Sequence, residues 1–110
     1  VGLLGGDDGP GLQRRLEIAR AISLQPELLL LDEPAAGMNA DEVVQLNELI
    51  TGIHRDFKLT ILLIEHHMDM VMAICPHIVC MNFGAKIAEG SPAEIQSHPD
   101  VLKAYLGEEE

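Results

Sequence analysis

Two nearly continuous apolar runs, residues 28–31 and 59–64, dominate the hydrophobic pattern of the chain, and Thr60 is the one polar residue in them. Runs without polar alternation predict strands that are buried on both faces of a parallel sheet. Between the runs, apolar residues recur at helical spacing over residues 41–53, directly after Asn39, which is a good N-cap residue. The order strand, helix, strand predicts a parallel βαβ unit.

Capping pairs, turn signals and helical spacing predict the remaining elements. They are helices over residues 12–24, 67–74 and 100–106, a helix beginning at Ser91–Glu94, and a β-hairpin of residues 78–82 and 85–88. Residues 1–11 contain five glycines and have the composition of a loop. We therefore predict an irregular N-terminal segment over residues 1–11 and a single α/β domain over residues 12–110.

The acidic composition limits the classes of partner. The net charge is −11 over 110 residues, which argues against nucleic acid as a direct partner. No apolar run is long enough to span a bilayer. Cys75 and Cys80 lie among apolar residues, so we expect small core residues in a reducing cytoplasm rather than a disulfide. Because the chain starts at Val1, we expect a fragment of a longer protein.

Candidate chemistry follows both apolar runs. Asp32 and Glu33 come directly after the first run, and His66 comes just after the second. Parallel neighbours end at the same edge of a sheet, so these side chains are expected on one rim, where α/β proteins bind ligands. One carboxylate can hold a hydrated Mg²⁺, the other can activate water, and a histidine can contact a γ-phosphate. The alternatives are a helix end stopped by Pro34 and an ordinary surface histidine; the other histidines, at positions 54, 67, 77 and 98, are interpreted as surface or loop residues.

With these motifs in place, the chain resembles the C-terminal half of an ATP-binding cassette (ABC) ATPase subunit over about residues 9–107. The resemblance implies a partial P-loop NTPase fold with a parallel sheet core, a C-terminal β-hairpin and short helices. The matching segments, in the order of the family, are the signature helix Gln13–Ala21, Walker B at Leu28–Glu33, the D-loop Ala36–Asn39, the switch segment Leu63–His66 and the tail Ile87–Ile95.

The resemblance also implies a role for individual residues. Asp32 would contact Mg²⁺ through water, Glu33 would polarise the attacking water, and His66 would contact the γ-phosphate. Two further positions, Gly11 and Gln13 at the start of the signature helix, would meet ATP bound on the opposite subunit. Asn39 would belong to the D-loop, where two ATPase subunits touch.

A narrower resemblance concerns the transported substrate. Residues 34–39 and 104–108 are similar to the ATPase of branched-chain amino-acid importers. The lipopolysaccharide-export ATPase is similar in residues 14–20 and 105–107, and it is the alternative. ATP and Mg²⁺ are the implied ligands. The implied partners are a second ABC ATPase subunit and transmembrane permease subunits, on the cytoplasmic face of the cell membrane.

The sequence departs from the family at three places. No G-x-x-x-x-G-K-[ST] segment occurs in the 110 residues, so they contain no phosphate-binding P-loop. The signature loop has Gly9 where the family has serine and Leu12 where it has glutamine. His67 stands where the family has aspartate, which we expect to weaken the cap of the following helix. Essentially no ATPase activity is therefore expected from the isolated chain.

A non-catalytic remnant or partner-binding module remains the alternative function. The absent P-loop and the altered signature loop favour this alternative, whereas the retained Asp32, Glu33 and His66 favour the ATPase. An ABC ATPase of DNA repair or translation is disfavoured by the acidic charge and the importer-like tail. Because a parallel sheet needs cover on both faces, we also predict exposed apolar surface and self-association.

Overall fold

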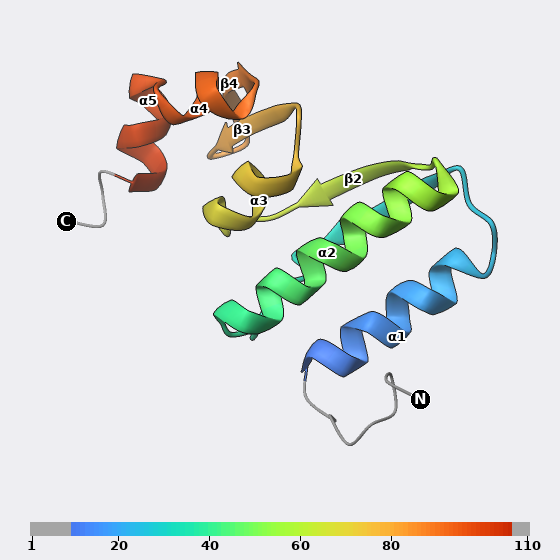
Figure 1. Ribbon diagram of the computed structural model, residues 1–110. Coiled ribbons are helices and arrows are strands. Elements are labelled where there is room, and N and C mark those ends of the chain that lie inside the picture. Colours follow the sequence, from blue (N-terminus) through green and yellow to red (C-terminus); the bar gives the residue numbers. More distant parts are fainter. Residues whose placement is uncertain (1–9, 107–110) are drawn as a thin grey trace. The chain divides into compact units, whose positions relative to one another are not determined.

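The computed structural model describes the backbone of residues 10–106 and the side chains of residues 11–104 (Figure 1). The chain divides into two compact units, the first extending to Met70 and the second beginning at Val71. Among the described residues, no helix is both long enough and apolar enough to cross a membrane.

The first unit contains the predicted βαβ arrangement. Its elements are α1 (Pro10–Ile22), β1 (Leu28–Asp32), α2 (Ala40–Phe57), β2 (Thr60–Ile64) and the first residues of α3 (Met68–Ile74). Strands β1 and β2 pair in parallel, with a register that runs from Leu28 opposite Thr60 to Asp32 opposite Ile64. The carboxyl ends of the two strands therefore lie at one edge.

Helix α2 begins and ends with well-formed caps. Asn39 Oδ1 accepts from the N–H of Glu42, and Glu42 Oε1 accepts in return from the N–H of Asn39, both at 2.9 Å. This capping box satisfies two N–H groups that a helix start leaves without partners. Lys58 ends the helix in the left-handed conformation. The apolar stripe of α2 supplies core residues, namely Val43, Leu46, Ile50 and Ile53.

Strand β1 buries only one of its two sides. Leu29 and Leu31 are 5% and 7% exposed, whereas the alternate residues Leu28 and Leu30 are 51% and 61% exposed. The prediction of burial on both faces is thus wrong for the described residues, because the sheet there has two strands and a single covered face. The prediction of exposed apolar surface is confirmed, and Leu62 and Ile64 of β2 extend it.

Helix α1 runs alongside α2 (Figure 1), and Arg15 donates a hydrogen bond to Gln45 Oε1 at 3.2 Å. Gly11 is buried at its start, where an added Cβ would come within 3.1 Å of Glu42 Oε2. Because α1 begins at Pro10, residues 10 and 11 belong to this helix and not to the irregular segment predicted over residues 1–11. Residues 1–9 of that segment lie outside the described residues.

The second unit is built on a β-hairpin followed by helices. Strands β3 (Ile78–Asn82) and β4 (Ala85–Gly90) pair antiparallel, as predicted. Phe83 and Gly84 join them with positive φ angles of 52° and 81°, as the primed turns of two-residue hairpins require. Helix α4 (Pro92–Gln96) starts with the predicted capping box, in which Ser91 and Glu94 cap each other.

The last helical segment differs from the predicted one. A short helix α5 (Pro99–Val101) begins one residue before Asp100, because His98 Nδ1 accepts from the Asp100 N–H at 3.1 Å and caps it. The chain then continues as a π-helical turn over Leu102–Leu106.

The two cysteines have the surroundings predicted for small core residues. Cys80 is buried, Cys75 is half-buried, and both are free thiols. Burial raises the pKa of both thiols above the ordinary value. Low reactivity at neutral pH follows, because the thiolate is the reactive form.

Candidate functional site

The candidate site lies where β1 and β2 end. Glu33 follows β1 directly, and Glu65 and His66 follow β2. The Glu33 N–H donates to the Ile64 carbonyl oxygen at 2.6 Å, so the two strand ends stay paired one residue beyond the ladder. Glu33 has a φ of 49°, a left-handed conformation that is uncommon outside glycine and turns the chain sharply out of the strand.

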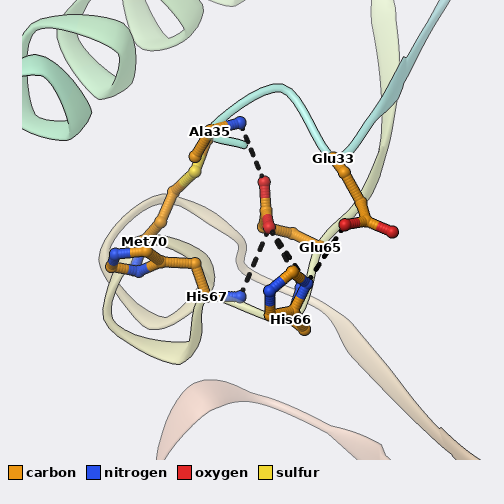
Figure 2. A network of polar contacts seen from close by, with 6 residues as sticks. All are labelled: Glu33, Ala35, Glu65, His66, His67 and Met70. Carbon is orange, nitrogen blue, oxygen red and sulfur yellow. Dashed lines mark hydrogen bonds and ion pairs between the residues drawn. The ribbon is translucent and has the colours of Figure 1, made fainter. Parts of the chain in front are cut away.

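The structure brings Glu33 and His66 together. Nδ1 of His66 lies 3.2 Å from Oε1 of Glu33, and both side chains are exposed to solvent (Figure 2). The proximity expected from the parallel strands is therefore observed. The pair combines a proton acceptor with a side chain that can carry a positive charge, beside open solvent where a ligand could enter.

Asp32 is the last residue of β1 and lies on its exposed side, two residues beyond Leu30. Within the described part of the chain, its carboxylate makes no hydrogen bond or ion pair. Its oxygens are thus free to hold the water shell of a cation. Oxygen ligands are the kind that Mg²⁺ prefers, and it usually keeps several waters. The role of Asp32 at a hydrated Mg²⁺ stays a prediction.

Glu65 is the site residue that sequence reasoning missed. Its side chain is only 1% exposed. Oε2 accepts from the N–H of Ala35 at 3.1 Å, and Oε1 accepts from the N–H groups of His66 at 3.1 Å and His67 at 3.4 Å (Figure 2). The only signal in the sequence was its place between the second apolar run and His66.

Glu33, Glu65 and His66 each offer one potential metal ligand atom, and the three atoms lie within 4.8 Å of one another. Glu65 is nevertheless a poor ligand in this arrangement, since backbone N–H groups already occupy both of its oxygens. The free carboxylate of Asp32 suits a hydrated cation better, and Glu33 is left to face His66.

Asp32 makes no hydrogen bond or ion pair to this cluster among the described residues, and three further predicted site residues lie outside it. Gly11 is buried against Glu42 at the start of α1, and Gln13 is exposed on the same helix. Asn39 uses its side chain to cap α2. Within residues 11–104, no hydrogen bond or ion pair connects any of these three to Glu33 or His66.

Three histidines without a predicted role make specific contacts. Nδ1 of His67 accepts from the N–H of Met70 at 3.4 Å, so His67 caps α3 through a long hydrogen bond, and the expectation that this cap is weaker than one from aspartate stays a prediction. His98 caps α5 in the same way. His77 lies 2.8 Å from Glu89, which also accepts from Lys86. Ring nitrogens are unusual as caps, which explains why composition alone did not reveal them.

The fold is shared with known ATP-binding cassettes. A crystal structure of the ADP conformation of MJ1267, an ATP-binding cassette of an ABC transporter, superposes with a TM-score of 0.81 and 29% identity, over 93% of this chain and 41% of that one. The structure of cbiO1 from Clostridium perfringens gives a TM-score of 0.75 and 29% identity, over 84% and 37%. The chain thus corresponds to the C-terminal portion of an ABC transporter ATP-binding subunit.

Sequence relatives narrow this class. The family described as branched-chain amino acid ATP-binding cassette transporter matches residues 85–110. The chain is 53% identical to the high-affinity branched-chain amino acid transport ATP-binding protein BraF of Pseudomonas aeruginosa and 54% identical to LivG of Salmonella typhimurium, over 98 residues each. These alignments include 89% of this chain, which spans 38% of the length of either relative.

Proposed function

We propose that this chain supplies the residues for ATP hydrolysis in an ABC ATPase subunit that drives branched-chain amino-acid import. These rim residues are Asp32, Glu33 and His66, at the ends of β1 and β2. The observation that carries the proposal is the pairing of Glu33 with His66 at the strand ends, 3.2 Å apart. It occurs in a chain that is 53% identical to BraF and 54% identical to LivG over 98 residues. The substrate class rests on those two relatives.

The three rim residues would divide the chemistry between them. Asp32 would hold Mg²⁺ through water, and the bound ion would offset negative charge on the phosphates. Glu33 would accept a hydrogen bond from the attacking water and orient it toward the γ-phosphate. Its left-handed backbone turns the chain out of β1 and its side chain is half-exposed, so the carboxylate would be open to a nucleotide and to water.

His66 would contact the γ-phosphate. Its Nδ1 faces Glu33, so Nε2 is the ring nitrogen left for a phosphate oxygen. Donation from both nitrogens requires the imidazolium form. In that form the ring would donate one hydrogen bond to the Glu33 carboxylate and another to the γ-phosphate. Loss of the γ-phosphate would remove the second hydrogen bond.

The start of α1 and the D-loop would contact a second ATPase subunit in a dimer. Gly11 and Gln13 lie in the first turn of α1, where N–H groups without helical partners favour phosphate. They would meet ATP held by a second ABC ATPase subunit, and the Asn39 segment would touch that subunit. The assembly would lie on the cytoplasmic face of the membrane, against transmembrane permease subunits.

The 110 residues contain no P-loop motif, so we expect no ATP hydrolysis by this chain alone. The proposal is tested in a chimera that joins the N-terminal part of LivG, including its own signature loop, to residues 13–110. We expect ATP hydrolysis by the chimera and a roughly 100-fold or greater loss in Glu33→Gln. Glu48→Gln, an exposed carboxylate on α2, is the matched control.

The outcomes separate the two functions. A folded chimera that binds ATP and never hydrolyses it would refute the ATPase proposal and favour the non-catalytic partner-binding module. Leucine uptake by the reconstituted transporter tests the substrate, with lipopolysaccharide export as the competing outcome. A second chimera, joined at Asp8, measures what Gly9 and Leu12 do to a signature loop.

A further inference from the structure

A buried carboxylate joins the two loops that carry the rim residues. The side chain of Glu65 is 1% exposed, and burying a charged carboxylate is unfavourable unless hydrogen bonds compensate it. The compensation comes from three backbone N–H groups, one on the loop after β1 and two on the loop after β2. We call this set, Glu65 with Ala35, His66 and His67, the Glu65 bridge.

The Glu65 bridge connects segments that are distant in sequence but carry neighbouring functional groups. Ala35 is two residues after Glu33 and thirty residues before Glu65, while His66 is the residue that follows Glu65. Figure 2 shows the Glu65 carboxylate between the two loops. A shift of one loop against the other would have to break the hydrogen bond from Ala35 to the Glu65 carboxylate, which is charge-assisted and therefore stronger than a neutral one.

The same carboxylate also lies beside the imidazole. Oε1 of Glu65 is 3.8 Å from Nδ1 of His66, the nitrogen that faces Glu33 at 3.2 Å. The ring therefore has two carboxylates on its Nδ1 side. This arrangement favours an N–H at Nδ1 and leaves Nε2 directed to other partners.

We propose that Glu65 is a positioning residue that fixes the loops after β1 and β2 relative to each other and so sets the Glu33–His66 contact. Its relevance to catalysis rests on the function proposed above. The role requires two acceptor oxygens. A glutamine has one acceptor oxygen and an NH₂ donor, so Glu65→Gln must leave either Ala35 or the His66–His67 pair facing a donor.

The bridge is tested by amide hydrogen exchange and ¹⁵N NMR on the 110-residue chain. The amides of Ala35, His66 and His67 should exchange slowly in the wild type, although none donates to a backbone carbonyl. In Glu65→Gln, exchange on one side of the bridge should accelerate about tenfold or more, as expected for losing a charged acceptor. The imidazole ¹⁵N shifts of His66 should change as well.

Glu48→Gln removes one exposed charge from α2 and should leave all of these signals unchanged. Rapid exchange of the three amides in the wild-type chain would overturn the proposal, and this measurement needs no variant to fold. Unchanged exchange and imidazole shifts in a folded Glu65→Gln variant would also overturn it.

In the LivG chimera, Glu65→Gln should lower kcat for ATP hydrolysis about tenfold and leave KM for ATP unchanged, since no P-loop contact is touched. A rise of about tenfold in KM for ATP, or a kcat equal to that of the wild-type chimera, would refute the positioning role. A wild-type chimera without ATPase activity would refute the proposed function instead, and the exchange experiment would still decide whether the bridge exists.

Discussion

The one-sided burial of β1 predicts that two neighbouring leucines contribute very differently to the free energy of unfolding. Leu29 and Leu30 are adjacent and chemically identical, yet they are 5% and 61% exposed. Replacing each by alanine removes the same atoms from the same strand. Any difference in the free energy of unfolding then reports the side of the strand, because strand propensity and sequence context are matched.

The expected magnitudes follow from burial. Leu29→Ala removes a fully buried side chain and should cost about 2–5 kcal/mol, the transfer term plus the cavity left behind. Leu30 is roughly two fifths buried, and full burial of a leucine contributes about 1.5–3 kcal/mol. Leu30→Ala should therefore cost about 1 kcal/mol or less.

Urea unfolding of both variants, followed by far-UV circular dichroism at low protein concentration, measures the two losses. Comparable slopes with denaturant would show that the variants expose the same surface on unfolding. Equal losses above about 2 kcal/mol for both leucines would refute the reasoning, since they would mean that Leu30 is also in a core.

Three further predictions concern other parts of the chain. The exposed apolar residues of β1 predict self-association of the wild-type chain, and Leu30→Lys should weaken it in a sedimentation velocity concentration series. Asn39→Ala should lower the free energy of unfolding by about 1 kcal/mol through loss of the α2 cap, measured by urea unfolding. Hydrogen bonds from Lys86 and then His77 lower the pKa of Glu89, so their stabilisation is present above the unfolded pKa and lost on acidification through the folded pKa. Between pH 5 and pH 3, wild type should therefore lose more stability than Glu89→Gln.

Local signals predicted those elements whose cause is local. The Asn39 cap, the Ser91–Glu94 capping box and the Phe83–Gly84 turn act within a few residues, and the structure has all three. The parallel pairing of β1 with β2 also followed from the pattern, as did the closeness of Glu33 and His66. Parallel strands leave little freedom in where their ends meet.

Two of the features that the sequence did not reveal depend on partners distant in the chain. A run of leucines has no periodicity, so nothing in residues 28–31 shows which side of β1 is covered. Glu65 gives no local signal because its Oε2 accepts from the N–H of Ala35, which lies thirty residues earlier in the sequence. His67 and His98 were missed for a chemical reason, since imidazole nitrogens seldom cap helices.

The close approach of Glu42 to Gly11 restricts which residues these two positions can hold together. Glu42 uses Oε1 to cap Asn39, and its Oε2 occupies the space that a side chain at position 11 would need. An alanine at position 11 would displace the carboxylate by a few tenths of an ångström and strain that cap. Homologous chains with a larger residue at position 11 should therefore carry a shorter one at position 42, a covariation linking the first turns of α1 and α2.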